Sequence, residues 1–279
     1  MIPAQIPPSS LPVPIFLFMI LQIENTNRCN AKCVFCAHKY MKRSQKTMEQ
    51  NIFEDIINQC MSIKNNLEGI YLTGLGEPLL DLYVVERVKL IKKKLNLPVT
   101  IYTNGTNLDK YLDKLLNIGL DVLYISLNAV NAQKRKEIMG IDGFDYLDNL
   151  IKNWNNKKCK LFISAVPDWG LMERSDCEEL FENYKCKADE IYFHYAANWA
   201  GKIFDLKFYP QKVCPRPFQM IHVLNDGRIA LCCLDLDGEV ILGNNIYEAL
   251  HSEKLNFYRQ KMLDGKRSEL ELCKNCTTV

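Results

Sequence analysis

Three cysteines within eight residues are the first feature of this chain that could do chemistry. Cys29, Cys33 and Cys36 stand in the segment NRCNAKCVFCAHK, and no fourth cysteine lies nearby. Thiolate is a soft ligand suited to iron-sulfur clusters and zinc, and a four-iron cluster that a protein closes completely takes four cysteines. Three cysteines therefore predict a cluster with one iron left open to a small chelating cofactor.

Four more cysteines with metal-ligand spacing stand near the end of the chain: Cys214, Cys232, Cys273 and Cys276. The first two frame Gly227 in a C-x12-G-x4-C pattern, and the last two form a C-x2-C pair. Such a set suits a closed four-iron cluster or a tetrahedral zinc site. Cys233 directly follows Cys232 and is an alternative ligand.

Composition indicates a globular protein that keeps its cysteines reduced. The 279 residues are 48% hydrophobic and 24% charged, which predicts one soluble body with at most a small appended domain. Twelve cysteines indicate metal binding or catalysis in the cytoplasm, where disulfides are rare. A net charge of +2 indicates no nucleic-acid partner. No apolar run reaches the ~20 residues of a membrane helix and no basic region precedes one, so we expect neither a membrane partner nor a signal peptide.

Six apolar runs predict strands that are buried on both faces of a parallel sheet. They span residues 18–24, 69–73, 98–103, 121–129, 160–166 and 190–196. Amphipathic segments between them predict helices, two of which open on capping-box pairs, Thr47 with Gln50 and Ser175 with Glu178. The alternation predicts a partial (β/α)6 barrel, similar to a TIM barrel but with fewer than its eight units. The three-cysteine loop follows the first strand, at the strand end where the chemistry of such barrels gathers.

The chain divides into three parts in this interpretation. Residues 1–17 form a proline-rich N-terminal extension, and residues 18–205 form the partial barrel. In residues 206–279, the segment FQMIHVLNDGRIALCC predicts a β-hairpin about an Asn-Asp-Gly turn, and an amphipathic helix is predicted near 246–262. We expect this small C-terminal domain to hold the second set of cysteines.

The first cysteine loop resembles that of the radical S-adenosylmethionine (SAM) enzymes. CNAKCVFC has their CxxxCxxC spacing, with the aromatic Phe35 before the last cysteine. The resemblance implies a [4Fe-4S] cluster on the three cysteines, whose open iron is chelated by the amino and carboxylate groups of SAM. It also implies the activity: the reduced cluster cleaves SAM to a 5′-deoxyadenosyl radical, which abstracts hydrogen from a substrate. The protein would position that substrate and exclude side reactions.

Further segments at strand ends resemble the SAM contacts of the same enzymes. TGLGEP at 73–78 is similar to their GGE motif, although Leu75 separates the two glycines. TNG at 103–105 and SLN at 126–128 follow the third and fourth predicted strands. The resemblance assigns SAM binding to these residues: Phe35, Gly74, Gly76, Glu77, Asn104, Ser126 and Asn128.

The C-terminal cysteines resemble the auxiliary-cluster region of SPASM and twitch proteins, where Gly243 with Asn244 matches a recurrent Gly-Asn pair. Ligands for a second auxiliary cluster are missing after Cys276, so the shorter twitch type fits. The resemblance implies one auxiliary [4Fe-4S] cluster on these ligands: Cys214, Cys232, Cys273 and Cys276. A fully ligated cluster has no iron free for substrate, so we expect it to transfer electrons, with structural zinc as the alternative.

The leading hypothesis is oxidation of a small polar substrate, such as a sugar or aminocyclitol alcohol, with the auxiliary cluster as electron acceptor. Removal of a proton from the substrate needs a base, and His194 at the sixth predicted strand is the candidate. Asn198, Trp199 and Gly201 resemble a motif of SPASM-type proteins, with no role assigned. The resemblance also implies an external one-electron donor such as flavodoxin or ferredoxin.

Two other hypotheses stay open. A peptide-modifying enzyme would oxidise, epimerise or crosslink residues of a ribosomal peptide. With the first strand expected near residue 18, we expect no leader-binding module before it, which favours the small-molecule substrate. A non-catalytic, metal-stabilised binding protein would carry degenerate motifs, whereas Cys29, Cys33, Cys36 and Glu77 are all present. Cleavage of SAM by the reduced protein would separate an enzyme from such a binding protein.

Overall fold

The computed structural model describes residues 19–167, 171–203 and 213–277. The extension predicted over residues 1–17 and the domain boundary predicted at 205/206 lie outside the described residues. Within the described ranges, no helix is long and apolar enough to cross a membrane.

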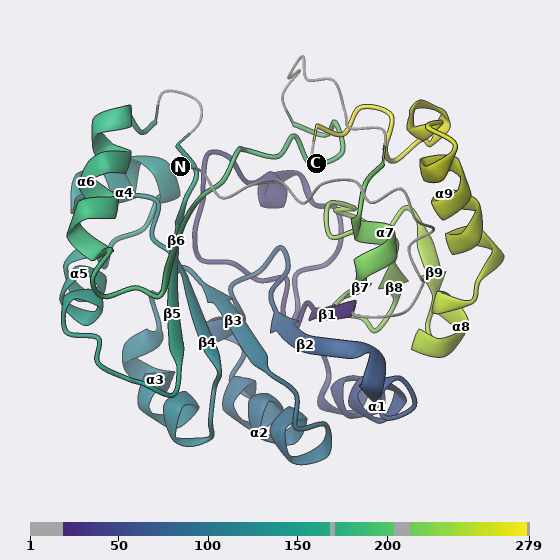
Figure 1. Ribbon diagram of the computed structural model, residues 1–279, viewed down its shortest axis with the longest axis horizontal. Coiled ribbons are helices and arrows are strands. Elements are labelled where there is room, and N and C mark those ends of the chain that lie inside the picture. The colour runs from purple at the N-terminus through teal and green to yellow at the C-terminus, as the bar shows by residue number, and fades with distance from the viewer. Residues whose placement is uncertain (1–18, 168–170, 204–212, 278–279) are drawn as a thin grey trace.

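Six parallel strands form an open arc, which confirms the partial (β/α)6 barrel (Figure 1). The strands lie in the order β6-β5-β4-β3-β2-β1, so each pairs with its neighbour in sequence. Parallel pairing of consecutive strands requires a crossover outside the sheet each time. The bounds are β1 (Met19–Ile23), β2 (Leu67–Leu72), β3 (Val99–Thr103), β4 (Val122–Ser126), β5 (Lys160–Ala165) and β6 (Glu190–Phe193).

Helices on the outer side of the arc supply these crossovers (Figure 1). Their apolar stripes are buried against the strands, as Phe53, Ile56 and Ile57 show for the first helix. The helices are α1 (Gln50–Cys60), α2 (Val84–Lys94), α3 (Leu108–Asn117), α4 (Ala132–Met139), α5 (Phe144–Lys152) and α6 (Arg174–Tyr184). Short 3-10 turns lie at η1 (Ala37–Tyr40), η2 (Lys64–Asn66), η3 (Pro78–Leu80) and η4 (Arg267–Glu269).

Alternate residues of the strands face two different environments. Ile101 and Leu123 are fully buried in the core that the strands share with the helices. The intervening residues place aromatic rings on the inner side of the arc, where the rings of Tyr102 and Tyr124 stack with centroids 4.2 Å apart. Tyr192 continues the stack at 5.9 Å from Tyr124. The barrel interior therefore has an aromatic floor made by three strands.

Both predicted capping boxes are wrong. The N-cap of α1 is Glu49, and Thr47 pairs with Thr26 in an isolated bridge instead. The capping box of α6 is formed by Glu173 with Asp176. An acidic residue occupies the N-cap position of both helices. The Glu173 carboxylate accepts a backbone N–H as a hydroxyl would, whereas the Glu49 side chain makes no capping hydrogen bond.

Two predicted strands overrun their observed ends. β4 and β6 stop at Ser126 and Phe193, three residues before the ends predicted at 129 and 196. Asn128 has a φ of 54°, which no β-strand accommodates. The residues after Ser126 therefore turn away from the sheet into the barrel mouth.

The predicted C-terminal hairpin is confirmed, and it extends the barrel sheet. β7 (Met220–Val223) and β8 (Ile229–Ala230) are antiparallel, and β9 (Ile241–Gly243) pairs with β8. β7 also pairs in parallel with β1, so nine strands form one sheet in the described part of the chain. The C-terminal cysteines are thereby attached to the same sheet as the three-cysteine loop.

The single helix predicted near 246–262 is two helices, α8 (Ile246–Leu250) and α9 (Glu253–Leu263). Ser252 separates them, because its hydroxyl accepts a hydrogen bond from the backbone N–H of Leu255 and caps the second helix. A four-residue helix, α7 (Arg216–Gln219), precedes β7.

Candidate functional site

One cavity of about 670 Å³ brings the predicted site residues together. It lies at the C-terminal ends of the barrel strands, as expected for this fold. Its walls include every residue predicted to hold the first cluster, to bind SAM or to act as the base: Cys29, Cys33, Phe35, Cys36, Gly74, Gly76, Glu77, Asn104, Ser126, Asn128 and His194.

The three-cysteine loop is fixed in place by backbone hydrogen bonds. The N–H groups of Lys32 and Val34 donate to the carbonyls at the end of α4, at 2.8 and 2.9 Å. Burial raises the pKa of the Cys29 thiol to about 12, and burial with the neighbouring thiols raises that of Cys33 further. Buried thiols of this kind deprotonate when a metal takes the place of their protons.

Three thiols on the wall of the cavity form its donor set: Cys29, Cys33 and Cys36. Among the described residues, no three His, Cys, Asp or Glu side chains lie close enough to hold one metal ion. A four-iron cluster is wider than an ion, so its ligands stand farther apart. Soft thiols on the wall of an open cavity are the ligands that such a cluster requires.

The two glycines after β2 are explained by close packing against the cluster loop. A Cβ on Gly76 would lie 2.2 Å from the carbonyl oxygen of Thr26, and one on Gly74 would lie 2.6 Å from Cγ of Glu24. Leu75, which interrupts the expected GGE motif, is buried in a small apolar cluster with residues of the C-terminal segment. The loop therefore joins three parts of the chain while its backbone lines the cavity.

The Glu77 carboxylate is fully engaged within the protein. It accepts hydrogen bonds from the Thr103 hydroxyl at 2.6 Å, from the Asn104 N–H at 2.6 Å and from the Leu79 N–H at 3.0 Å. Burial raises its pKa, and these donors oppose that effect. Glu77 thus holds the loop after β2 against the loop after β3 and presents both to the cavity.

The two asparagines of the site also make fixed contacts. Asn104 Nδ2 donates to Asn30 Oδ1 in the cluster loop at 2.8 Å. Asn128 Oδ1 accepts from the Val166 N–H at 2.9 Å. The left-handed backbone of Asn128 is a strained conformation of the kind that gathers at functional sites. Both side chains have their positions set before any ligand binds.

His194 lies against the aromatic floor of the cavity. Its Nε2 is 2.6 Å from the Tyr124 hydroxyl, and its ring stacks on Tyr192. Burial lowers the pKa of the imidazole, so the ring is neutral at neutral pH. When Nε2 donates its proton to Tyr124, Nδ1 is left as a free acceptor. That arrangement suits a general base, and Tyr124 is a site residue that the sequence did not single out.

The four C-terminal cysteines are free thiols, and the charges of Cys232, Cys214 and Cys276 act on that of Cys273. Burial raises the pKa of Cys214, and raises that of Cys273 to about 12. The hydrogen bond between the thiols of Cys232 and Cys233 raises the pKa of Cys232 and lowers that of Cys233. Cys214 acts on both Cys232 and Cys233, so Cys233 stays an alternative ligand to Cys232.

The Asn198 motif holds the C-terminal cysteine turn against the barrel. Asn198 Nδ2 donates to the Asn275 carbonyl at 2.6 Å, and its Oδ1 accepts from the Thr277 N–H at 3.0 Å. The Trp199 indole N–H donates to the Phe35 carbonyl in the cluster loop at 3.1 Å. One segment after β6 therefore contacts both cysteine sets, which gives this motif a structural role.

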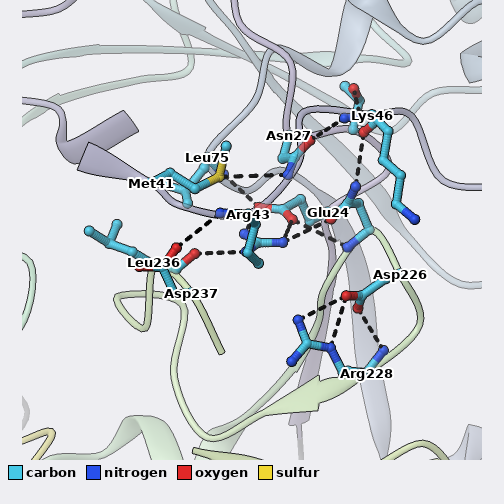
Figure 2. A network of polar contacts seen from close by, with 12 residues as sticks. Glu24, Asn27, Met41, Arg43, Lys46, Leu75, Asp226, Arg228, Leu236 and Asp237 are labelled. Atoms are coloured by element: carbon cyan, nitrogen blue, oxygen red, sulfur yellow. Dashed lines mark hydrogen bonds and ion pairs between the residues drawn. The ribbon is translucent and has the colours of Figure 1, made fainter. Parts of the chain in front are cut away.

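A buried ion pair joins the cluster loop to the hairpin from the other side (Figure 2). Arg43 binds Glu24 through two hydrogen bonds of 2.6 and 3.0 Å and donates to Asn225 Oδ1 and to the Leu236 carbonyl. Glu24 also accepts from the Leu75 N–H at 3.1 Å. The side chains of Arg43 and Glu24 are 8% and 4% exposed. This network, together with the Asn198 motif, holds the two cysteine regions together.

Two family models match the chain. The model of the radical SAM superfamily matches residues 23–180, and that of the SPASM iron-sulfur cluster-binding domain matches residues 214–277. The chain therefore belongs to the radical SAM superfamily. Membership implies SAM and a [4Fe-4S] cluster as cofactors, and the SPASM match implies an auxiliary cluster.

Individual relatives are more distant. A probable GTP 3′,8-cyclase of Pyrococcus abyssi is 26% identical over 93% of this chain and 80% of its own length. An uncharacterized protein of Methanocaldococcus jannaschii is 28% identical over 85% of this chain and 83% of its own. Neither identity is high enough to carry an activity to this chain.

Solved structures share the fold. BtrN in complex with AdoMet and 2-DOIA aligns with a TM-score of 0.70 at 21% identity, covering 94% of each chain. SuiB of Streptococcus suis, bound to the precursor peptide SuiA, aligns with a TM-score of 0.68 at 18% identity, covering 94% of this chain and 70% of SuiB.

Proposed function

We propose that this radical SAM enzyme dehydrogenates a small polar substrate that carries a hydroxyl or amino group. The observation that carries the proposal is a second set of four free cysteines, whose C-terminal turn is held to the cluster loop through Asn198 and Trp199. Four thiols complete a cluster and leave no iron for substrate, which leaves electron transfer as its function. An electron acceptor beside the substrate favours net oxidation.

The residues of the cavity divide between two tasks in this proposal. Cys29, Cys33 and Cys36 hold the SAM-binding cluster, and the loop carrying Gly74 and Gly76 contacts SAM. The SAM site is completed by Phe35, Asn104, Ser126 and Asn128. Glu77 holds the loop after β2 against the loop after β3. When bound, SAM and the reduced cluster supply the 5′-deoxyadenosyl radical that takes a hydrogen atom from the substrate.

The remaining step is the loss of a proton and an electron from the substrate. We assign the proton to Nδ1 of His194, whose Nε2 contacts Tyr124. Cys214, Cys232, Cys273 and Cys276 would hold the auxiliary cluster that supplies an acceptor for the electron. In net terms, substrate and SAM give oxidised substrate, methionine, 5′-deoxyadenosine and a proton. The electrons balance, because the electron that cleaves SAM is recovered from the substrate.

An external donor must provide the first electron. The cluster loop between residues 25 and 48 contains no acidic residue. Its exposed cations flank the three cysteines in the sequence: Arg28, Lys32, Lys39, Lys42 and Lys46. This surface suits a negatively charged donor such as flavodoxin or ferredoxin. We place the enzyme in the cytoplasm, where free thiols persist, and treat residues 206–279 as its auxiliary-cluster domain.

A peptide substrate is the second candidate. SuiB, whose fold matches this chain, is bound to a precursor peptide in its structure. Tyr195 at the wall of the cavity is 87% exposed, so the site is open enough for a longer substrate. In such an enzyme the same residues would act on a side chain of the peptide.

The test is product analysis with deuterium-labelled candidates. Reconstituted protein, SAM and dithionite would be incubated without oxygen with polyols and aminocyclitols, with GTP, or with peptides. We expect deuterium in 5′-deoxyadenosine and an equal amount of a small product that lacks two hydrogen atoms. A modified peptide would establish the second candidate, and a rearranged product of unchanged mass would contradict oxidation. Absence of SAM cleavage would contradict any enzymatic function.

A further inference from the structure

Arg216 occupies the wall between the cavity and the C-terminal cysteines. Its side chain lines the cavity, and it follows Cys214 by two positions. Its positive charge acts on the thiols of Cys233, Cys232, Cys214 and Cys276. No carboxylate among the described residues forms an ion pair with it. Arg216 therefore lines the substrate cavity and lies two residues from Cys214, within electrostatic reach of the C-terminal thiols.

A second polar group without a partner lies behind Arg216. His222 on β7 is 2% exposed, and neither of its ring nitrogens has a hydrogen-bond partner in the described part of the chain. It pairs across the sheet with Ala230, two residues before Cys232. Burial and the charge of Arg216 lower its pKa to about 3, so the neutral ring keeps one N–H.

We propose that Arg216 is a positioning residue for electron transfer, whose charge raises the reduction potential of the auxiliary cluster. The inference rests on the proposed function, in which the cluster accepts the electron left on the substrate radical. A [4Fe-4S] cluster gains one negative charge when it is reduced, and a nearby cation stabilises the more negative state. Because Arg216 also lines the cavity, this stabilisation acts on the side from which the electron arrives.

The experiment measures the potential of the auxiliary cluster alone. In a Cys29→Ala, Cys33→Ala, Cys36→Ala parent only the C-terminal cluster remains, and its reduction is followed by electron paramagnetic resonance during a potentiometric titration. We expect Arg216→Gln to shift the midpoint to a lower potential and Arg216→Lys to stay close to the parent. Arg228→Gln serves as the matched control, because Arg228 pairs with Asp226 at the hairpin turn.

The outcomes separate this inference from the proposed function. An unchanged midpoint in Arg216→Gln with iron still bound would overturn the role of Arg216 and leave the cluster in place. If Arg216→Gln fails to hold iron, the test uses Arg216→Lys, which keeps the positive charge. A shifted midpoint potential in Arg216→Lys would show that the charge of Arg216 does not set the potential. A parent without iron would overturn the proposed function itself, and this inference with it.

Discussion

The imidazole of His194 is held by its contact with the Tyr124 hydroxyl at 2.6 Å and by stacking on Tyr192. The hydrogen bond fixes the orientation of the ring, and burial lowers the pKa of the ring below its ordinary value of 6.5. Both properties suit a base that must be neutral before it accepts a proton. The chemistry proposed for the substrate proton therefore depends on two residues that lie 70 positions apart.

Replacement of this base separates hydrogen abstraction from oxidation. We expect His194→Gln to reduce product formation by about 10²- to 10⁴-fold, the usual contribution of general acid-base catalysis. Formation of 5′-deoxyadenosine should continue, because the radical forms without the base. The measurement compares the two products by chromatography in the same reaction. Equal losses of both would contradict the assignment of His194.

The pH dependence follows from the direction of the pKa shift. Because the pKa of His194 is lowered, the ring is protonated only at pH values below 6.5, and the rate of oxidation should fall there as the pH decreases. Tyr124 and Tyr192, the titratable groups in contact with the ring, are both neutral in this range, since burial raises their pKa values. The acid limb should move in Tyr124→Phe, which removes the hydrogen bond. A pH profile of Tyr124→Phe identical to that of the unchanged protein would contradict the proposed role of the Tyr124–His194 hydrogen bond.

At the scale of elements, the contact between the cluster loop and the hairpin depends on the buried ion pair of Glu24 with Arg43. Removal of one partner of a buried ion pair typically costs about 3–5 kcal/mol, because the other charge is left buried. We expect Glu24→Gln to lower the melting temperature of the reconstituted protein by roughly 10 °C. The control is Asp142→Asn, which breaks the exposed pair of Asp142 with Lys136. Exposed pairs contribute only ~0–1 kcal/mol to stability. Equal losses of melting temperature in Glu24→Gln and Asp142→Asn would therefore contradict a stabilising role of the buried pair.

Gly201 tests the attachment of the C-terminal cysteine turn. Its φ is +83°, and a Cβ there would lie 2.7 Å from Cβ of Asn275, between Cys273 and Cys276. Gly119 has a φ of +84° but no atom within 4 Å of such a Cβ. Both changes to alanine strain the backbone, by roughly 1 kcal/mol. Only Gly201→Ala should lose auxiliary iron, and equal iron contents in the two variants would disprove the attachment.

Elements with a local signal could be predicted from the sequence. All six barrel strands were expected within three residues of their observed bounds, because runs of buried apolar residues mark parallel strands. The pairing of β7 with β1 could not be predicted in the same way. It joins segments about two hundred residues apart, and no local pattern records a partner at that distance.

The same distinction applies to the site. Cysteines and glycine-rich loops were predicted because their residue types and spacings are unusual. Tyr124 and Arg216 were missed because their importance comes from what the fold brings next to them. The sequence identified Gly76 as part of a motif. It could not predict the packing of Gly76 against the cluster loop, because that contact also depends on the fold.

At the scale of the whole molecule, the positive charge of the cluster loop predicts where an external electron donor docks. We expect a Lys39→Glu, Lys42→Glu variant to raise the KM for a flavodoxin donor, and the effect to shrink at high salt. The rate with dithionite should stay unchanged, because this small reductant needs no docking surface. Lys93→Glu on the outer face of α2 is the matched charge control. A dithionite rate that falls equally would indicate damage to the cluster rather than lost docking.

The two cysteine regions are joined by one sheet and by contacts on both sides of the cavity, so the account requires two clusters in one molecule. The most direct measurement is iron and labile sulfide per chain after anaerobic reconstitution, in the unchanged protein and in the Cys29→Ala, Cys33→Ala, Cys36→Ala variant. About eight irons falling to about four is the predicted result, since each set of thiols holds one four-iron cluster. About four irons falling to none, with one zinc retained per chain, would make the C-terminal cysteines structural and contradict the oxidation proposed here.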